Sequence, residues 1–330
     1  MGRGSKRRRG GGATVLASAL SLVACEGPQS ALDPGGHGAA QLAGLFWVML
    51  AAAGVLWVVV VAIAVVAVRL RPGEHRRRTA TFLMLGGGVV VPTVLLAALL
   101  WHGLGLMRDL RQPADPAAVA VRVDGELWWW RITYLFPDGS TVESANEVRL
   151  PVGERVRLDL ASQNVIHSFW LPSIGGKMDL IPGRTNELVL EPTKAGDYRG
   201  QCAEYCGPAH ALMAFSTEVM PKESFARWLD AEAKPAAEGG GAGLDTFLAY
   251  GCGACHSIRG TSANGRIGPD LTHVASRATL GAGTLPNAPD NLRLWIGHTQ
   301  DLKPDVRMPS FGMIPDADMT ALVAYLEGLK

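Results

Sequence analysis

The feature that most constrains the fold is a pair of long apolar stretches near the N-terminus, residues 42–68 and roughly 80–107. Each exceeds the ~20 residues that a transmembrane helix needs. Neither carries a polar stripe at helical period, which argues against two buried helices of a soluble core. The sequence therefore predicts a transmembrane hairpin within residues 40–108, with Pro92 as a candidate kink in its second helix.

Charge gives the orientation of this hairpin in a bacterial plasma membrane. A basic cluster joins the two stretches and consists of Arg69, Arg71, Arg76, Arg77 and Arg78. The positive-inside rule assigns such a loop to the cytoplasm, so both termini and everything after about Arg108 are predicted to face the periplasm or exterior. Over the whole chain, 31 basic residues balance 30 acidic ones, which argues against a nucleic-acid partner.

The first 24 residues are predicted to be a secretory signal peptide. A basic start precedes an apolar run over residues 13–24 that is too short to cross a bilayer. The run ends in Leu22-Val23-Ala24-Cys25, which resembles a bacterial lipoprotein cleavage box and makes Cys25 the candidate lipid anchor. An uncleaved leader with an incidental cysteine is the alternative. A twin-arginine signal fits less well, because glycines follow the arginines.

The external part divides into two predicted domains. Residues 117–221 show short segments rich in β-branched and aromatic residues, and Arg155–Leu160 alternates as a half-buried strand does, so we expect a β-sandwich or Greek-key barrel. Residues 231–243 are rich in Ala, Gly, Pro and Glu and are predicted to be a linker. Residues 244–330 are predicted to form a small all-α domain that ends in a helix over Pro315–Leu329.

One short stretch, residues 201–213, gathers two thiols, an imidazole and a thioether from Cys202, Cys206, His210 and Met213. Sulfur ligands with imidazole select copper or zinc, and a thioether favours copper. His167, in a strand-like segment, is the candidate second histidine. A disulfide between the two cysteines, or a structural zinc site made by the cysteines and both histidines, is the simpler alternative.

This constellation resembles the dinuclear copper A site of cytochrome c oxidase subunit II, and the resemblance covers most of residues 40–220. It implies a cupredoxin-like domain in which two cysteines bridge two copper ions and each copper takes one histidine. It also implies a thioether ligand, a carbonyl ligand and a nearby magnesium ion at the boundary with subunit I. The implied copper ligands are His167, Cys202, the Glu204 carbonyl, Cys206, His210 and Met213, and the Glu204 side chain would help to bind magnesium.

Two further features bear on this resemblance. In relatives, the first aromatic residue of a cluster such as Trp128-Trp129-Trp130 helps to receive electrons from cytochrome c, which would give Trp128 that role. The alternative for any of these tryptophans is ordinary packing. Many relatives also carry an acidic residue in the second span near a proton path. The corresponding residue is Leu85, which places proton uptake through this subunit in doubt.

Residues 252–256 read Cys-Gly-Ala-Cys-His, the attachment signature of c-type heme. Cys252 and Cys255 would bind the heme covalently and His256 would bind its iron, while a redox disulfide or a zinc pair is the alternative. Met308, just before the terminal helix, is the predicted second axial ligand, as in class I cytochromes c. Met313 is its competitor. His273 and His298 are expected at the surface, and the Pro269 carbonyl is expected to steady the proximal histidine.

Together with the resemblance, these features imply an electron-transfer subunit of a caa-type heme-copper oxidase, a complex expected to reduce oxygen in subunit I and to translocate protons. The expected partners are subunit I, subunit III and a cytochrome c or bc-complex donor. A flexible linker with a reach of roughly 20 Å would tether the heme domain near its acceptor. A copper A and heme c subunit of a nitric oxide reductase is the runner-up. A copper-storing or copper-delivering lipoprotein would have no use for the heme signature.

Overall fold

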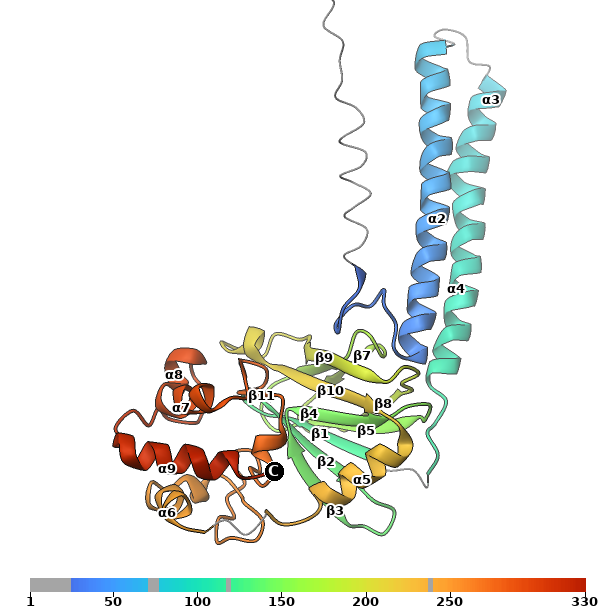
Figure 1. Ribbon diagram of the computed structural model, residues 1–330. Coiled ribbons are helices and arrows are strands. Elements are labelled where there is room, and N and C mark those ends of the chain that lie inside the picture. The colour runs from blue at the N-terminus through green and yellow to red at the C-terminus, as the bar shows by residue number, and fades with distance from the viewer. Residues whose placement is uncertain (1–24, 71–76, 117–119, 237–239) are drawn as a thin grey trace, which may run out of the picture.

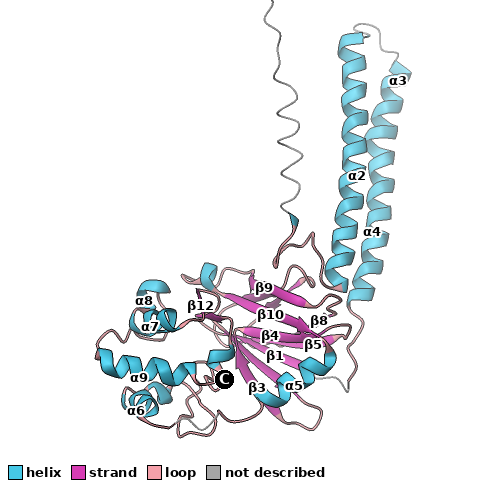
Figure 2. Ribbon diagram, viewed as in Figure 1, coloured by secondary structure: helices cyan, strands magenta, loops and turns pink. Residues whose placement is uncertain are grey.

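The computed structural model describes residues 25–70, 77–116, 120–236 and 240–330, so the predicted signal peptide lies outside the described residues (Figure 1). Two long helical rods stand away from a β-sandwich, and a small helical domain lies against the sandwich on its other side. Figure 2 shows that strands dominate the middle domain and helices the two flanking parts. The predicted fold class is confirmed in all three parts.

The two rods form the apolar hairpin. The first consists of α2 (His37–Val65) and the π-helical turn η2 (Val66–Leu70), and the second of α3 (Arg77–Phe82), η3 (Leu83–Val90) and α4 (Val91–Leu110). Each rod is long and apolar enough to span a membrane, and its most apolar window is unburied. Each also extends beyond the predicted stretch, because backbone hydrogen bonding continues into polar residues. At the foot of the hairpin, His37 Nε2 lies 2.9 Å from Asp109 Oδ2.

The sandwich contains two five-stranded sheets. The first has the order β3 (Thr141–Ala145), β2 (Trp130–Leu135), β1 (Ala120–Gly125), β5 (Val156–Ser162), β8 (Asn186–Leu190). The second has the order β4 (Glu147–Pro151), β10 (Ala214–Met220), β9 (Gly196–Cys202), β6 (His167–Trp170), β7 (Lys177–Leu180). The β1–β5 and β4–β10 pairs are parallel and the other pairs are antiparallel.

Aromatic side chains fill the space between the sheets. Trp130 is fully buried and makes edge contacts with Phe169 and Phe215, which stack on each other with ring centroids 4.3 Å apart. Helix α5 (Lys222–Glu232) closes one side, where Trp228 contacts Tyr134. This rigid core supports the loops at the end of the sandwich that faces the helical domain.

The C-terminal domain has its own apolar core, built on helix α9 (Asp316–Glu327) with Met319, Leu322 and Leu326 facing inward. Its other elements are α6 (Ala242–Ala249), η5 (Cys252–Ala254), η6 (Val274–Ser276), β11 (Thr279–Leu280), β12 (Leu285–Pro286), α7 (Pro289–Gly297) and α8 (Thr299–Leu302). Helix α5 ends at Glu232 and α6 begins at Ala242, and the predicted linker lies between them, with residues 237–239 outside the described part of the chain.

Candidate copper and heme centres

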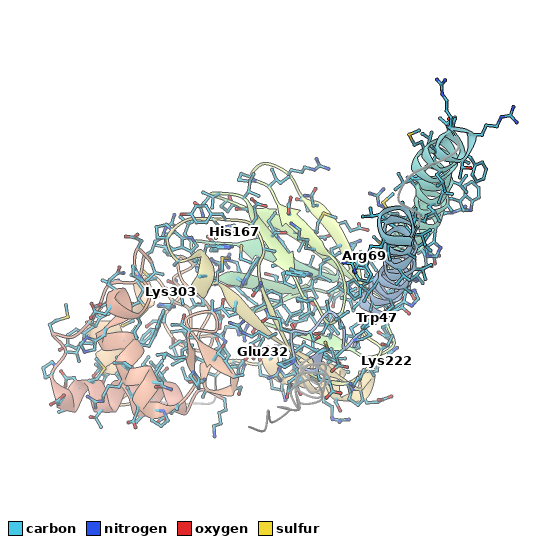
Figure 3. The ribbon with its side chains drawn as sticks, turned by 90° about the horizontal axis from the view of Figure 1, so that it is seen from above. Trp47, Arg69, His167, Lys222, Glu232 and Lys303 are labelled. Carbon is cyan, nitrogen blue, oxygen red and sulfur yellow. The ribbon has the colours of Figure 1, made fainter. Side chains whose placement is uncertain are left out.

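The predicted copper ligands meet at the end of the second sheet. His167 begins β6 and Cys202 ends β9, and these neighbouring strands pair Phe169 with Cys202. Figure 3 shows His167 inside the sandwich, on the side toward the helical domain. The loop from β9 to β10 supplies the remaining ligands and includes the short 3₁₀ helix η4 (His210–Leu212). Its two ends are joined, since the Cys202 N–H donates to the Met213 carbonyl at 2.9 Å.

The ligand atoms form a compact cluster around two facing sulfurs. Cys202 Sγ lies 3.8 Å from Cys206 Sγ and 3.9 Å from His167 Nδ1. Cys206 Sγ lies 3.5 Å from His210 Nδ1 and 3.9 Å from Met213 Sδ. Each sulfur thus faces the other sulfur and one imidazole of its own. His167, Cys202 and Cys206 offer ligand atoms within 4.8 Å of one another, which could hold a soft metal ion, and all described cysteines are free thiols.

The surroundings of the cluster also fit a metal. His167 is fully buried, and its Nδ1 atom is directed at Cys202 Sγ. A Cβ built on Gly125 would lie 2.7 Å from the His167 ring, so β1 closes tightly over the imidazole. The Glu204 carbonyl oxygen lies 3.2 Å from Cys202 Sγ, while the Glu204 side chain is exposed. The donor set of thiolates, imidazoles, thioether and carbonyl suits copper.

The shifted pKa values of the two cysteine thiols also favour binding of a cation. Hydrogen bonding with Cys206 lowers the pKa of the Cys202 thiol to about 3, with a smaller contribution from His167. The same contact raises the pKa of Cys206, and burial adds to that rise. One sulfur therefore becomes a thiolate easily, and the second gives up its proton when a cation approaches.

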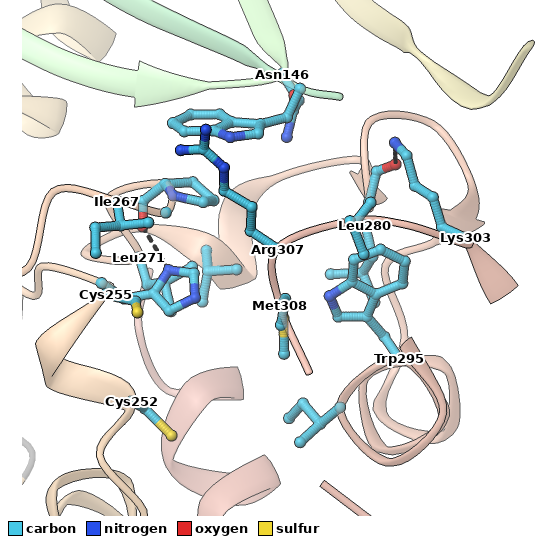
Figure 4. Close-up of a pocket in the computed structure, with 18 of the residues that line it drawn as sticks. Asn146, Cys252, Cys255, Ile267, Leu271, Leu280, Trp295, Lys303, Arg307 and Met308 are labelled. Atoms are coloured by element: carbon cyan, nitrogen blue, oxygen red, sulfur yellow. Dashed lines mark hydrogen bonds between the residues drawn. The ribbon is translucent and has the colours of Figure 1, made fainter. Parts of the chain in front are cut away.

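A second site lies in the C-terminal domain, where a largely apolar cavity of about 360 Å³ is lined by Cys252, Cys255, His256 and Met308. The short helix η5 brings His256 close to the two cysteines of the motif, because the His256 N–H donates to the Cys252 carbonyl at 2.9 Å. Figure 4 shows Met308 reaching into the cavity between Cys255 and Trp295. The two thiols, the imidazole and the thioether therefore border one apolar space, which suits a porphyrin.

The proximal histidine is held in one orientation. His256 Nδ1 lies 2.8 Å from the Pro269 carbonyl, the contact that the sequence predicted. Burial lowers the pKa of His256, although the carbonyl acts in the opposite direction. The ring is therefore neutral with its proton on Nδ1, which leaves Nε2 free for a metal. A Cβ on Gly268 would lie 2.5 Å from this ring, so the loop forms a fitted cradle for it.

The other predicted residues lie away from the cavity. Met313 is 71% exposed and does not line it, and His298 is exposed as expected. His273 corrects the prediction of a surface position, because it is only 8% exposed and its Nε2 contacts the Lys234 carbonyl at 3.1 Å. The segment after α5 folds back over this histidine, a tertiary contact with no local sequence signal.

The cavity also contains two buried polar groups that the sequence did not point to. Arg277 Nε and Thr279 Oγ1 have no hydrogen-bond partner among the described residues, and both side chains line the cavity. Buried donors without partners are costly unless a ligand accepts from them. They match the carboxylates of a heme, whose ring the rest of the cavity would enclose. A lone arginine and a lone threonine carry no recognisable motif, which explains why sequence reasoning missed them.

Part of the cavity wall belongs to the sandwich. Trp128, Trp129 and Asn146 line the cavity from the copper domain. Trp128 is only 6% exposed, and its indole N–H donates to the Cys206 carbonyl at 2.8 Å. Trp128 therefore touches both sites, on one side as cavity wall and on the other as a hydrogen-bond donor to a candidate copper ligand.

Comparison with known proteins assigns both domains. Residues 136–220 match the family profile "Cytochrome C oxidase subunit II, periplasmic domain", and residues 242–330 match "Cytochrome c". Cytochrome c oxidase subunit 2 of Alkalihalophilus pseudofirmus is 34% identical over 250 residues, which are 73% of this chain and 71% of that protein. The Bacillus subtilis subunit 2 is 32% identical over 256 residues, 73% of this chain and 70% of that protein.

A solved structure is also similar to the middle of the chain. It is the periplasmic domain of subunit II of cytochrome oxidase from Bradyrhizobium japonicum, with 32% identity and a TM-score of 0.33, and the match covers 36% of this chain and 96% of that one. The identity and coverage of the full-length relatives show the family. The chain belongs to the cytochrome c oxidase subunit 2 family, as a member that carries a C-terminal cytochrome c domain.

Proposed function

We propose that the chain accepts electrons from a cytochrome c or bc-complex donor at its heme domain and delivers them from its copper domain to subunit I. There, oxygen is reduced to water and protons are translocated. Family membership supports the role in a heme-copper oxidase and favours it over the nitric oxide reductase alternative. Association with subunit I follows from that membership, and we extend the proposal to subunit III.

The copper domain would hold a dinuclear copper A centre. The proposed bridging ligands are Cys202 and Cys206, and the proposed terminal ligands are His167, His210, Met213 and the Glu204 carbonyl. When bound, this centre supplies one-electron chemistry with little change in geometry, since the charge spreads over both metals. The protein contributes a rigid sheet end that holds the ligands in place, which keeps reorganisation small.

The heme domain would hold one covalent heme c. Cys252 and Cys255 would bind it, and His256 and Met308 would ligate its iron from opposite sides. The Pro269 carbonyl fixes the tautomer of the proximal histidine. Arg277 Nε and Thr279 Oγ1, which have no hydrogen-bond partner among the described residues, would donate to the heme carboxylates. A thioether ligand in an apolar cavity favours a high potential, which suits an electron carrier.

The observation that carries the proposal is the shared tryptophan. Trp128 forms cavity wall on the heme side and donates its indole N–H to Cys206 on the copper side. This contact supports transfer between the two centres inside one chain. It also supports an electron-receiving role for Trp128, here toward the chain's own heme domain.

The remaining assignments concern the membrane. We propose that residues 1–24 are a lipoprotein-type signal, that Cys25 is the lipid anchor, and that both termini lie on the periplasmic side with the copper domain (117–221) and the heme domain (244–330). The exposed Glu204 at the tip of the copper loop is available for magnesium at the subunit I boundary. Leu85 supplies no carboxylate, so we propose that proton uptake does not run through this residue.

The test is metal and heme analysis of the detergent-purified full-length chain with electron paramagnetic resonance. We expect one covalent heme, two coppers and a single electron spin shared between them. We also expect reduced cytochrome c to reduce the heme before the copper. A zinc-loaded protein, or one with both cysteine pairs oxidised to disulfides and no iron, would disprove the proposal.

A further inference from the structure

Lys303, which directly follows α8, is one of the largest fully buried side chains in the described part of the protein, with an exposed fraction of 1%. Lysine is almost never buried so completely unless its charge is satisfied. Figure 3 places Lys303 where the heme domain meets the copper domain, on the same side of the sandwich as His167. It also lines the heme cavity at the edge nearest the sandwich.

Three backbone carbonyls receive the three N–H groups of its ammonium. Lys303 Nζ lies 2.8 Å from the Trp128 oxygen, 2.7 Å from the Leu212 oxygen and 2.7 Å from the Gly281 oxygen. An ammonium has three donors and no acceptor, so each donor has its own carbonyl. The described residues contain no salt bridge to this lysine. The side chain is therefore held by backbone that cannot move away without exposing the charge.

The three carbonyls come from three different parts of the chain. Trp128 lies in the loop between β1 and β2, and Leu212 lies in the copper loop, directly before the candidate ligand Met213. Gly281 belongs to the turn between β11 and β12 of the heme domain. One side chain from the heme domain thus bonds to two copper-domain loops, the copper loop and the loop that contains Trp128.

The turn that provides Gly281 is itself inserted against the copper domain. Gly281, Ala282 and Gly283 all have positive φ, and Ala282 is fully buried. The Ala214 N–H at the start of β10 donates to the Ala282 carbonyl at 2.9 Å. A Cβ on Gly283 would lie 2.9 Å from the Ala214 Cβ, so only a glycine allows this approach. The heme domain therefore packs closely against the copper domain, whereas the composition of the linker suggested a loosely tethered heme domain.

We propose that Lys303 is a positioning residue that clamps the heme domain onto the copper loop in a single docked arrangement and thereby sets the rate of electron transfer between the two centres. The proposal deepens the function proposed above and rests on it. The step that it serves moves one electron from the reduced heme centre to the oxidised copper centre, with no bond made or broken and no proton transferred. Among the described residues, Lys303 Nζ makes no hydrogen bond to a candidate metal ligand, so it acts on the copper site through the Trp128 and Leu212 carbonyls.

The experiment uses the full-length, cofactor-loaded chain in detergent. Lys303→Met keeps the length of the side chain but removes its charge and its donors. Light-driven reduction of the heme then gives the first-order rate of transfer to copper. We expect this rate to fall severalfold, because electron transfer slows steeply as two centres move apart and Lys303→Met removes the hydrogen bonds that hold the two domains in one arrangement. Lys330→Met, an exposed lysine of the heme domain, is the matched control and should leave the rate unchanged.

Two readouts distinguish positioning from general damage. Hydrogen exchange should accelerate at the backbone N–H of Ala214 in Lys303→Met but not in Lys330→Met. The reduction potential of the copper centre should fall, because a buried positive charge near the oxidised centre has been removed. Lys303→Arg keeps charge and donors and should restore part of the rate. If Lys303→Met fails to incorporate its cofactors, Lys303→Gln, which keeps two N–H donors without charge, takes its place.

The results separate this proposal from the proposed function. A Lys303→Met protein with its full heme and copper content, a wild-type transfer rate and unchanged hydrogen exchange would overturn the clamp and leave the function intact. A wild-type chain that contains no copper or no heme would instead remove the function on which the clamp rests.

Discussion

Gly125→Ala should damage the copper site while leaving the sandwich folded. The added Cβ would lie 2.7 Å from His167 Cδ2 and 2.9 Å from its Cγ, about 0.7 Å short of the 3.4 Å at which ordinary contacts begin. His167 cannot yield easily, because it is fully buried with Trp130 at a ring-centroid distance of 6.1 Å. Overpacking of this kind costs about 1–3 kcal/mol. Metal–ligand distances tolerate only about 0.2 Å, so the required shift is several times larger than the site allows.

The assay is copper content together with electron paramagnetic resonance of the purified chain. Gly125→Ala should lose copper or show a spectrum in which the two metals no longer share one spin. Gly176→Ala is the control, because a Cβ there meets nothing within 4 Å. If Gly125→Ala binds copper in wild-type amount with a wild-type spectrum, the imidazole of His167 is not a ligand and the reasoning fails.

Three other changes give independent tests. Gly268→Ala would place a Cβ 2.5 Å from the His256 ring, which should move the ring off its contact with the Pro269 carbonyl and shift the heme absorption and reduction potential. Gly297→Ala is the control, because a Cβ there meets nothing within 4 Å. If both variants have the same heme spectrum, Gly268 does not form a cradle for His256. Trp128→Phe removes the hydrogen bond from the indole N–H to the Cys206 carbonyl, which should lower the free energy of unfolding by about 0.5–1.5 kcal/mol and slow electron transfer from heme to copper. An unchanged transfer rate would show that Trp128 does not couple the two sites. Burial raises the pKa of Glu147 above 4.5, even though Ala278, Arg277 and Arg149 oppose it. The folded protein therefore binds the Glu147 proton more tightly than the unfolded chain does. This contribution to the free energy of unfolding should be fully present below pH 4.5 and be lost as the pH rises through the raised pKa of Glu147. The urea midpoint should therefore fall over this pH range in the wild type but not in Glu147→Gln.

Motifs that are local in sequence led directly to local structure. The Cys-Gly-Ala-Cys-His motif predicted that two thiols and His256 serve one site, and in the structure a short helical turn places all three at one cavity. The loop of residues 201–213 likewise contains most of the proposed copper ligands, and the alternation over Arg155–Leu160 matches β5. The two apolar stretches predicted the hairpin, since bilayer thickness determines helix length. In each case, the controlling feature lies within a single continuous segment of the chain.

Contacts between distant segments could not be predicted in the same way. His167 was reached only through a resemblance, because a single histidine in a strand has no pattern of its own. Lys303 and Arg277 had no signal at all, since a lysine after a short helix and an arginine in a loop are usually solvated. His273 was misjudged for the same reason. Burial of such residues is decided by tertiary contacts between distant segments, which neither composition nor periodicity records.

The docking of the two domains changes how each site must be understood. The heme cavity takes part of its wall from Trp128 and Asn146 of the copper domain, and the copper loop takes a buried cation, Lys303, from the heme domain. Separating the domains would leave the lysine without two of its three carbonyl partners and would open the cavity wall. Because buried polar groups lose most when their partners are removed, the docked arrangement is favoured by the same contacts that join the two sites. Rapid transfer and interdomain stability therefore depend on the same few residues, and a substitution at the junction should affect both together.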